Sequence, residues 1–180
     1  MRQNPEAKAK QLLLANYEAY YRLAFSYMGN ESDALDVVQE SAYKIIRDAG
    51  SVRDPNLLPT WIWRVIMNTA LDFLRKRKKE IVGLENIEEP SDPAAEQDFF
   101  RVDTLTEDPL RLLASLSAAD KTIVILKVLE NRKLEEISEI MNMNVNTIKA
   151  RLYRALKKLR IELEPEFAGK GDYYDRKQKQ

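Results

Sequence analysis

Apolar residues recur at spacings of three and four along most of the 180-residue chain, and strand-type alternation is nearly absent. This period is typical of amphipathic helices, so the sequence predicts an all-α protein. The longest interruption of the pattern is at residues 81–108, where nine acidic residues accompany two prolines and a single basic residue, Arg101. We therefore expect two small helical domains, at residues 5–80 and 109–164, joined by a flexible acidic linker.

The acidic segment has a net charge of −8, whereas residues 1–80 carry +3 and residues 109–163 carry +5. Its 28 residues, at ~3.3 Å each, can reach about 90 Å, so the two domains need not touch. Within the acidic segment, residues 94–102 are compatible with a short helix. The alternative interpretation is that the whole acidic segment is a solvated loop within one larger domain. Residues 165–180, which begin at Pro165 and end in polar side chains, are expected to form a disordered tail.

Composition excludes several kinds of chemistry. The chain contains no Cys and no His, so disulfides, thiolate zinc sites, Cys nucleophiles and His general bases are impossible. Only 5 glycines are present, and neither common glycine-rich phosphate motif occurs. We therefore expect a protein that is not an enzyme and needs no metal or cofactor. No apolar run is long enough for a membrane span or a signal peptide, which favours a cytoplasmic location.

Three helices are expected in the first block. The first spans residues 13–27 and ends at Gly29-Asn30. The second has Ser32 as its N-cap, and the third opens with Pro59 in its first turn. That third helix carries two tryptophans and ends in a basic run at residues 75–79.

Aromatic side chains beside a cationic track suit single-stranded nucleic acid, because bases stack on aromatic rings while Lys and Arg follow the phosphates. The alternative is that these aromatics form core, which we expect for Phe73. Trp61 and Trp63 are two positions apart and cannot share a helix face. One of them is therefore expected to pack inside and the other to be partly exposed.

The second block contains a short helix at residues 134–141, a turn at 142–144 and a longer helix at 145–163, stopped by Pro165. This is the pattern of a helix-turn-helix. A preceding helix is expected to be capped by Ser117. Between residues 149 and 160 the longer helix has six basic side chains and no acidic one: Lys149, Arg151, Arg154, Lys157, Lys158 and Arg160.

Basic side chains on a helix in the major groove can bind phosphates and guanine edges. Positions early in the helix are expected to face bases, namely Asn146, Lys149, Ala150, Tyr153 and Arg154, and the later Lys157 and Lys158 to hold phosphates. A solvated basic face on an ordinary helical hairpin is the alternative.

Three segments together resemble the bacterial RNA polymerase sigma factors of the small, extracytoplasmic-function class. They are DALDVVQE at residues 33–40, TWIWRVIMNTALDFLR at residues 60–75 and NTIKARLYRA at residues 146–155. The resemblance implies an N-terminal bundle of the region 2 type and a C-terminal helix-turn-helix of the region 4 type.

The resemblance also implies roles for individual residues. Asp36, Gln39 and Glu40 would dock on the clamp helices of the polymerase β′ subunit, and the C-terminal domain on the β flap. The −10 element would be captured by the loop at residues 51–58 and the third helix, through Val52, Trp61, Arg64, Asn68, Arg75 and Lys76. The −35 element would be held by Asn146, Lys149, Ala150, Tyr153, Arg154 and Lys157. Two positions depart from the family pattern, since Ala150 replaces a frequent hydroxyl residue and Val52 a frequent aromatic one.

The implied function is to bring core RNA polymerase to promoters and to nucleate DNA melting. The two promoter elements are about 17 base pairs apart, roughly 58 Å at ~3.4 Å per pair, which the acidic linker can bridge. An anti-sigma partner, of a kind that is often membrane-anchored, is also implied. Two alternatives remain: a stand-alone helix-turn-helix regulator of duplex operator DNA, and a helical adaptor with no nucleic-acid role.

Overall fold

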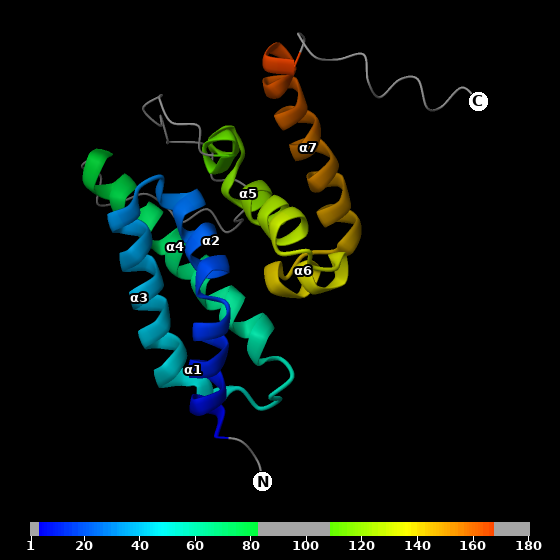
Figure 1. Cartoon of the computed structure of the whole chain (residues 1–180). Coiled ribbons are helices and arrows are strands. Elements are labelled where there is room, and N and C mark those ends of the chain that lie inside the picture. The colour runs from blue at the N-terminus through cyan, green and yellow to red at the C-terminus, as the bar shows by residue number, and fades with distance from the viewer. Residues whose placement is uncertain (1–3, 83–108, 168–180) are drawn as a thin grey trace.

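A computed structural model describes residues 4–82 and 109–167, and within them every regular element is helical (Figure 1), which confirms the all-α prediction. The N-terminal half, residues 4–82, contains α1 (Pro5–Ala15), α2 (Tyr17–Met28), α3 (Glu31–Asp48), the 3₁₀ turn η1 (Ala49–Ser51) and α4 (Leu58–Val82). The C-terminal half, residues 109–167, contains the 3₁₀ segment η2 (Pro109–Ser115), α5 (Ala118–Val124), the π-helical turn η3 (Ile125–Leu129), α6 (Leu134–Met141) and α7 (Val145–Phe167). The acidic linker beyond Val82, with the short helix expected at 94–102, lies outside the described residues.

The first expected helix is in fact two helices, α1 and α2, which meet at Asn16. The Asn16 side chain donates a hydrogen bond to the carbonyl of Leu12 at 2.9 Å, and its backbone leaves helical geometry. Asparagine side chains compete in this way with the helical ladder, which ends the first helix. The predicted end of α2 is confirmed, because Gly29 adopts φ 71°, a left-handed conformation that costs glycine little.

Two predicted helix boundaries need correction. The N-cap of α3 is Asn30, whose Oδ1 accepts from the backbone N–H of Asp33 at 2.9 Å, and Ser32 lies inside the helix. Pro165 does not stop α7, which continues to Phe167, so the first residues of the expected tail are helical. A proline removes one backbone hydrogen bond and bends a helix, and its position alone does not distinguish a bend from an end.

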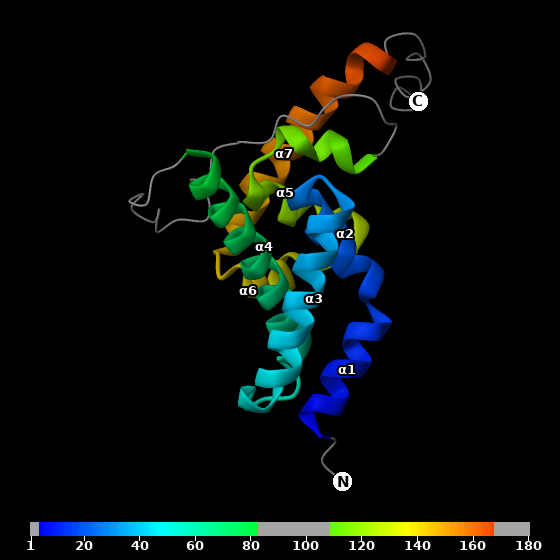
Figure 2. The ribbon, with the colours of Figure 1, turned by 90° about the vertical axis from the view of Figure 1, so that its left-hand side faces the viewer.

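The N-terminal half is a bundle in which α2, α3 and α4 pack against one another, with α1 beside α3 (Figure 2). Its interior is lined by side chains that are fully buried, including Leu23, Ile45 and Ile62. Each side chain of this size stabilises the fold by about 1.5–3 kcal/mol when it leaves water. Pro59 lies in the first turn of α4, as predicted.

The C-terminal half has the predicted helix-turn-helix. α6 and α7 flank a turn in which Asn142 has φ 52°, and the two helices pack on α5 and η3. Ile137 and Ile148, one from each helix of the motif, are completely buried. Ser117 caps α5, as predicted, by accepting from the Asp120 N–H.

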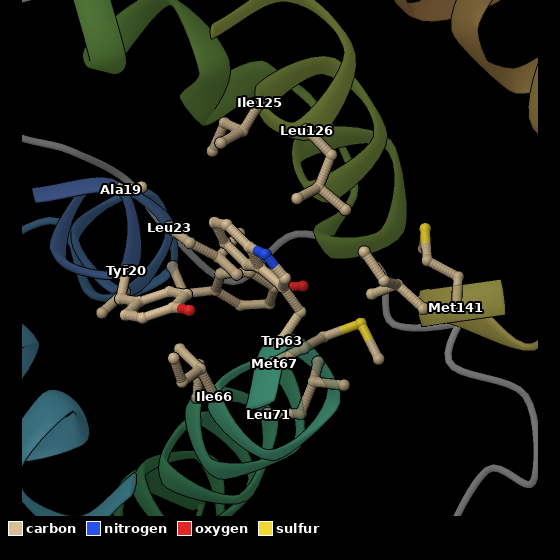
Figure 3. Packing of buried hydrophobic residues seen from close by; sticks show 14 of the residues in the cluster. Ala19, Tyr20, Leu23, Trp63, Ile66, Met67, Leu71, Ile125, Leu126 and Met141 are labelled. Carbon is tan, nitrogen blue, oxygen red and sulfur yellow. The ribbon is translucent and has the colours of Figure 1, made fainter. Parts of the chain in front are cut away.

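The two halves do touch, although the linker length does not require it. α4 packs against α6, and α2 against α5 and η2. Figure 3 shows Trp63, Met67 and Leu71 of α4 facing the same interior as Leu126 of η3 and Met141 of α6. The buried side chains of both halves thus form one continuous apolar cluster.

Candidate nucleic-acid interface

The outer face of α7 carries the residues that the sequence assigns to a −35 element. The helix starts where the Asn144 side chain accepts from the Asn146 N–H at 2.8 Å. All six predicted residues are exposed to solvent: Asn146, Lys149, Ala150, Tyr153, Arg154 and Lys157. Tyr153 is 74% exposed, which is unusual for an aromatic side chain without a ligand. The opposite face, with Ile148 and Ala155, is buried, so α7 presents a basic and aromatic surface outward.

Arg151 does not belong to that outer surface. Its guanidinium lies 3.0 Å from the Asp120 carboxylate in the first turn of α5, and only 15% of its side chain is exposed. Lys158, expected on phosphates, donates to the backbone carbonyl of Ser115 at the end of η2. Arg151 is therefore withdrawn from the exposed basic face, and Lys158, although exposed, is held by a backbone carbonyl of its own domain.

The residues predicted for the −10 element differ in their surroundings. Asn68 and Lys76 are exposed on α4, and the Lys76 ammonium lies 5.9 Å from the centre of the Phe73 ring. Arg75 is half-buried and lies 3.3 Å from the Asp72 carboxylate. Trp61 and Val52 are partly buried against the core.

Arg64 has the most distinct environment of this set, because its guanidinium donates to backbone carbonyls of α6. The structure therefore does not gather all six residues into one open site. Trp63 is 1% exposed while Trp61 is partly exposed, as the two-residue spacing predicts.

A polar face runs along α3. Asp36, Gln39 and Glu40 are exposed on it, at the spacing of residues that share one helix face. Tyr43, one turn further, is 63% exposed and was not singled out from the sequence. The Arg47 guanidinium lies 5.5 Å from the Tyr43 ring centre and hydrogen-bonds Asp48, which lowers the pKa of that carboxyl group. Tyr43 could have been found from the sequence, because it lies three residues after Glu40 and four after Gln39 and therefore on the same helix face.

The described helices offer no other obvious chemistry. Residues 4–82 and 109–167 contain no group of three acidic, His or Cys side chains placed to hold a metal ion. Across the same residues, no helix is both long enough and apolar enough to cross a membrane.

Comparisons with known proteins agree with the sequence resemblance. The family model for Sigma-70 region 2 matches residues 12–80, and that for Sigma-70 region 4 matches residues 110–159. The RNA polymerase sigma factor SigV of Bacillus subtilis is 45% identical over 148 residues, which are 82% of this chain and 86% of that protein. The RNA polymerase sigma-E factor of Streptomyces coelicolor is 32% identical over 147 residues, 81% of this chain and 80% of that protein.

A solved structure with the same fold is that of the sigma factor RpoE in complex with the anti-sigma factor NepR, from Bartonella quintana. It superimposes with a TM-score of 0.68 at 26% sequence identity and covers 86% of this chain and 96% of that one. The ECF RNA polymerase sigma factor SigW of Bacillus subtilis is a further relative, 28% identical over 79% of this chain and 82% of that protein. The chain therefore belongs to the sigma-70 family of RNA polymerase sigma factors, in the extracytoplasmic-function class.

Proposed function

We propose that this sigma factor holds core RNA polymerase with α3, opens the −10 element with α4 and binds the −35 element with α7. Residues 5–80 would then form the unit for polymerase and the −10 element, and residues 109–164 the unit for the −35 element. The observation that carries the proposal is the separation of two exposed faces, one on α3 with two carboxylates and one amide, the other basic and aromatic on α7. Sigma factors are non-enzymatic initiation subunits, and no step here needs a catalytic group.

At the −35 element, Lys149, Tyr153 and Arg154 lie on one exposed face of α7. Lys and Arg can pair with guanine edges in the major groove or neutralise phosphates, and the Tyr153 ring can contact a thymine methyl group. Ala150 offers no hydrogen bond, so contacts at its base pair are apolar. We expect binding to weaken steeply with salt, because each neutralised phosphate releases condensed counterions.

At the −10 element, strand opening costs about 1.4 kcal/mol for each stacked step. Stacking of a flipped base on an aromatic side chain returns about 1–3 kcal/mol, so α4 can nucleate melting while polymerase supplies the remainder. Asn68 is the exposed polar side chain on α4 that is best placed to hydrogen-bond such a base. Trp61 and Val52, which are partly buried against the core, would provide apolar walls.

Core RNA polymerase would be bound through Asp36, Gln39 and Glu40, with Tyr43 as an aromatic anchor on the same face. We place the partner contacts on the β′ clamp helices for this face and on the β flap for the C-terminal half. Because a related chain has been solved with an anti-sigma factor, we also infer an anti-sigma partner for this chain. Its place of action would be the cytoplasm, with the polymerase.

Run-off transcription with purified core polymerase and a promoter-containing template tests the proposal. The expected result is a promoter-dependent start that requires this protein. No such start would overturn the proposal, and tight operator binding without polymerase would favour the stand-alone regulator. In the same assay, Asn68→Ala should reduce open-complex formation more than closed-complex formation, and an equal loss of both would contradict the base-capture role.

A further inference from the structure

We propose that Lys8 of α1 is a positioning residue for recognition of the −10 element, because it holds the loop at residues 51–58 in one of the two turn conformations that its sequence allows. The inference rests on the proposed function, since this loop is the one that would capture a −10 base. It goes further by giving a part in promoter specificity to α1, which carries none of the residues assigned above to polymerase or DNA.

The middle of this loop is a tight turn. The Leu57 N–H donates to the backbone carbonyl of Asp54 at 3.0 Å, and the Asn56 N–H donates to the Asp54 carboxylate at 2.9 Å. A hydrogen bond between the first and fourth residues of a segment is typical of a β-turn, so Pro55 and Asn56 are its central residues. The bond to the Asp54 side chain is the local one that aspartate commonly makes at this position. The loop is therefore centred on the peptide group between Pro55 and Asn56.

The sequence of this turn is compatible with two conformations. Type I and type II turns differ by a rotation of about 180° of the central peptide group. Proline suits the first central position of both types, and asparagine tolerates the positive φ that type II requires at the second. Among the described residues other than glycine, positive φ values occur at Asn131 and Asn142, so Asn56 does not adopt the type II conformation. The two central residues do not by themselves select the observed orientation of the peptide group.

Lys8 holds one end of that central peptide group. Its Nζ donates to the Pro55 carbonyl at 3.0 Å, across 47 residues of sequence. The Asp54 carboxylate accepts from the N–H at the other end of the same group. A flip to type II would turn the carbonyl away from Lys8, and hydrogen bonds with a charged partner are the stronger ones. Lys8 thus supplies the long-range part of the selection, which a substitution in α1 can remove.

The helix that carries Lys8 is itself firmly placed. Its start is capped by Asn4, whose Oδ1 accepts from the Glu6 N–H at 3.1 Å. Ala9, next to Lys8, is completely buried, and α1 packs against η1, the turn that leads into the loop. Figure 1 shows the start of α1 beside the chain that enters α4. A side chain on a fixed helix holds its partner with less positional freedom than one on a second loop would.

The turn conformation decides where the exposed tip of the loop lies. Leu57 directly follows the two central residues, is 51% exposed and accepts a hydrogen bond from the Trp61 N–H at 2.9 Å. Leu57 and Trp61 are four positions apart and Asn68 is seven positions further, so the three lie on one face of α4 and its entry. A base captured at Asn68 and Trp61 would meet Leu57 on its loop side. A fixed loop rejects a base that does not fit, whereas a loop with two conformations can adapt to it.

Nuclear magnetic resonance of the free protein tests the contact without polymerase. The distance from the Pro55 Hα to the Asn56 N–H is long in a type I turn and short in a type II turn, so their nuclear Overhauser effect reports the flip. Lys8→Met removes the donor and should raise this signal by about threefold or more. Lys8→Arg keeps a cationic donor and should leave the signal weak. An unchanged signal in Lys8→Met would overturn the proposal.

Lys10→Met is the matched control. Lys10 lies on the same helix, and its ammonium pairs with the Glu6 carboxylate at 2.7 Å. The variant therefore removes the same charge from α1 but leaves the Pro55 carbonyl bonded, and the turn should stay as in the wild type. A stronger signal in Lys10→Met would assign the effect to net charge, and a stronger signal in Lys8→Arg would show that the donor is not what matters. Either result would overturn the proposal.

Open-complex formation with core polymerase tests the consequence for specificity. Templates that differ only in the captured −10 base give the ratio of the rates on the preferred base and on each other base. Lys8→Met should lower this ratio by about three- to tenfold, whereas Lys10→Met and Lys8→Arg should keep it. An unchanged ratio in Lys8→Met, or an equal loss on every template, would overturn the proposal. If the wild type gives no promoter-dependent start, the proposed sigma function fails, while the resonance measurement still decides whether Lys8 sets the turn.

Discussion

At the residue scale, the kinds of side chain on each surface follow from the sequence, but their partners do not. All six residues predicted for −35 contact are exposed, because helical period alone decides which face of α7 is buried. Arg151 has the same charge as its neighbours and was grouped with them. Its pairing with Asp120 depends on how α5 crosses α7, which local sequence does not specify.

The Arg151–Asp120 pair gives a test of that distinction. Arg151→Ala should lower the free energy of unfolding by about 1–3 kcal/mol, since it leaves a half-buried carboxylate without its partner. It should leave the salt dependence of promoter binding by the polymerase-bound protein unchanged. Lys149→Ala is the matched control on the outer face. It should reduce the size of the slope of log binding constant against log salt concentration by about 1, as expected for one lost phosphate contact. Denaturant titration and salt titration measure the two effects, and an altered slope in Arg151→Ala would place that guanidinium on DNA.

Tyr20 gives a prediction on pH. Burial raises the pKa of the Tyr20 hydroxyl to about 12, with Arg132 opposing the rise and Glu130 adding to it. Between the ordinary value of 10.0 and about 12, the unfolded chain releases this proton and the folded chain keeps it, so stability falls as the pH rises. The stability contributed below pH 10 by the protonated group is then lost, up to about 3 kcal/mol. Denaturant titrations from pH 9 to 12 should show a smaller loss for Tyr20→Phe than for the wild type, and parallel curves would contradict the assignment.

At the element scale, the helix-turn-helix, the Ser117 cap and the start of α4 were predictable because each depends on a few neighbouring residues. The errors arose where two local signals competed. Asn30 and Ser32 are both residue types that cap helices well. The backbone geometry at Asn30 makes this residue the N-cap of α3. The break at Asn16 was hidden by an apolar period that continues across it.

Those two cap candidates provide a matched pair of variants. Asn30→Ala should lower the free energy of unfolding by about 1 kcal/mol, because the Asp33 N–H loses its acceptor. Ser32→Ala should change it little, since Ser32 is an exposed position inside the helix. Urea titration followed by circular dichroism at 222 nm compares them. Equal effects of the two variants would show that Asn30 is not the effective cap.

At the scale of the whole molecule, the two halves were predictable and their packing was not. The acidic interruption marks where one helical block ends, but the Arg22–Glu130 pair joins residues 108 positions apart. Such a contact depends on the complementary shapes of two finished surfaces. No periodicity or motif in either segment encodes it. The packing of the two halves also places Arg64, assigned from the sequence to DNA, against backbone carbonyls of α6.

One chain, bound to core polymerase, should engage two promoter elements through its two halves. Hydroxyl-radical footprinting of the reconstituted complex, combined with permanganate probing of unpaired thymines, tests it most directly. We expect two protected regions centred about 17 base pairs apart, with permanganate reactivity confined to the downstream one. A single protected region, or protection by the protein that does not require polymerase, would contradict it.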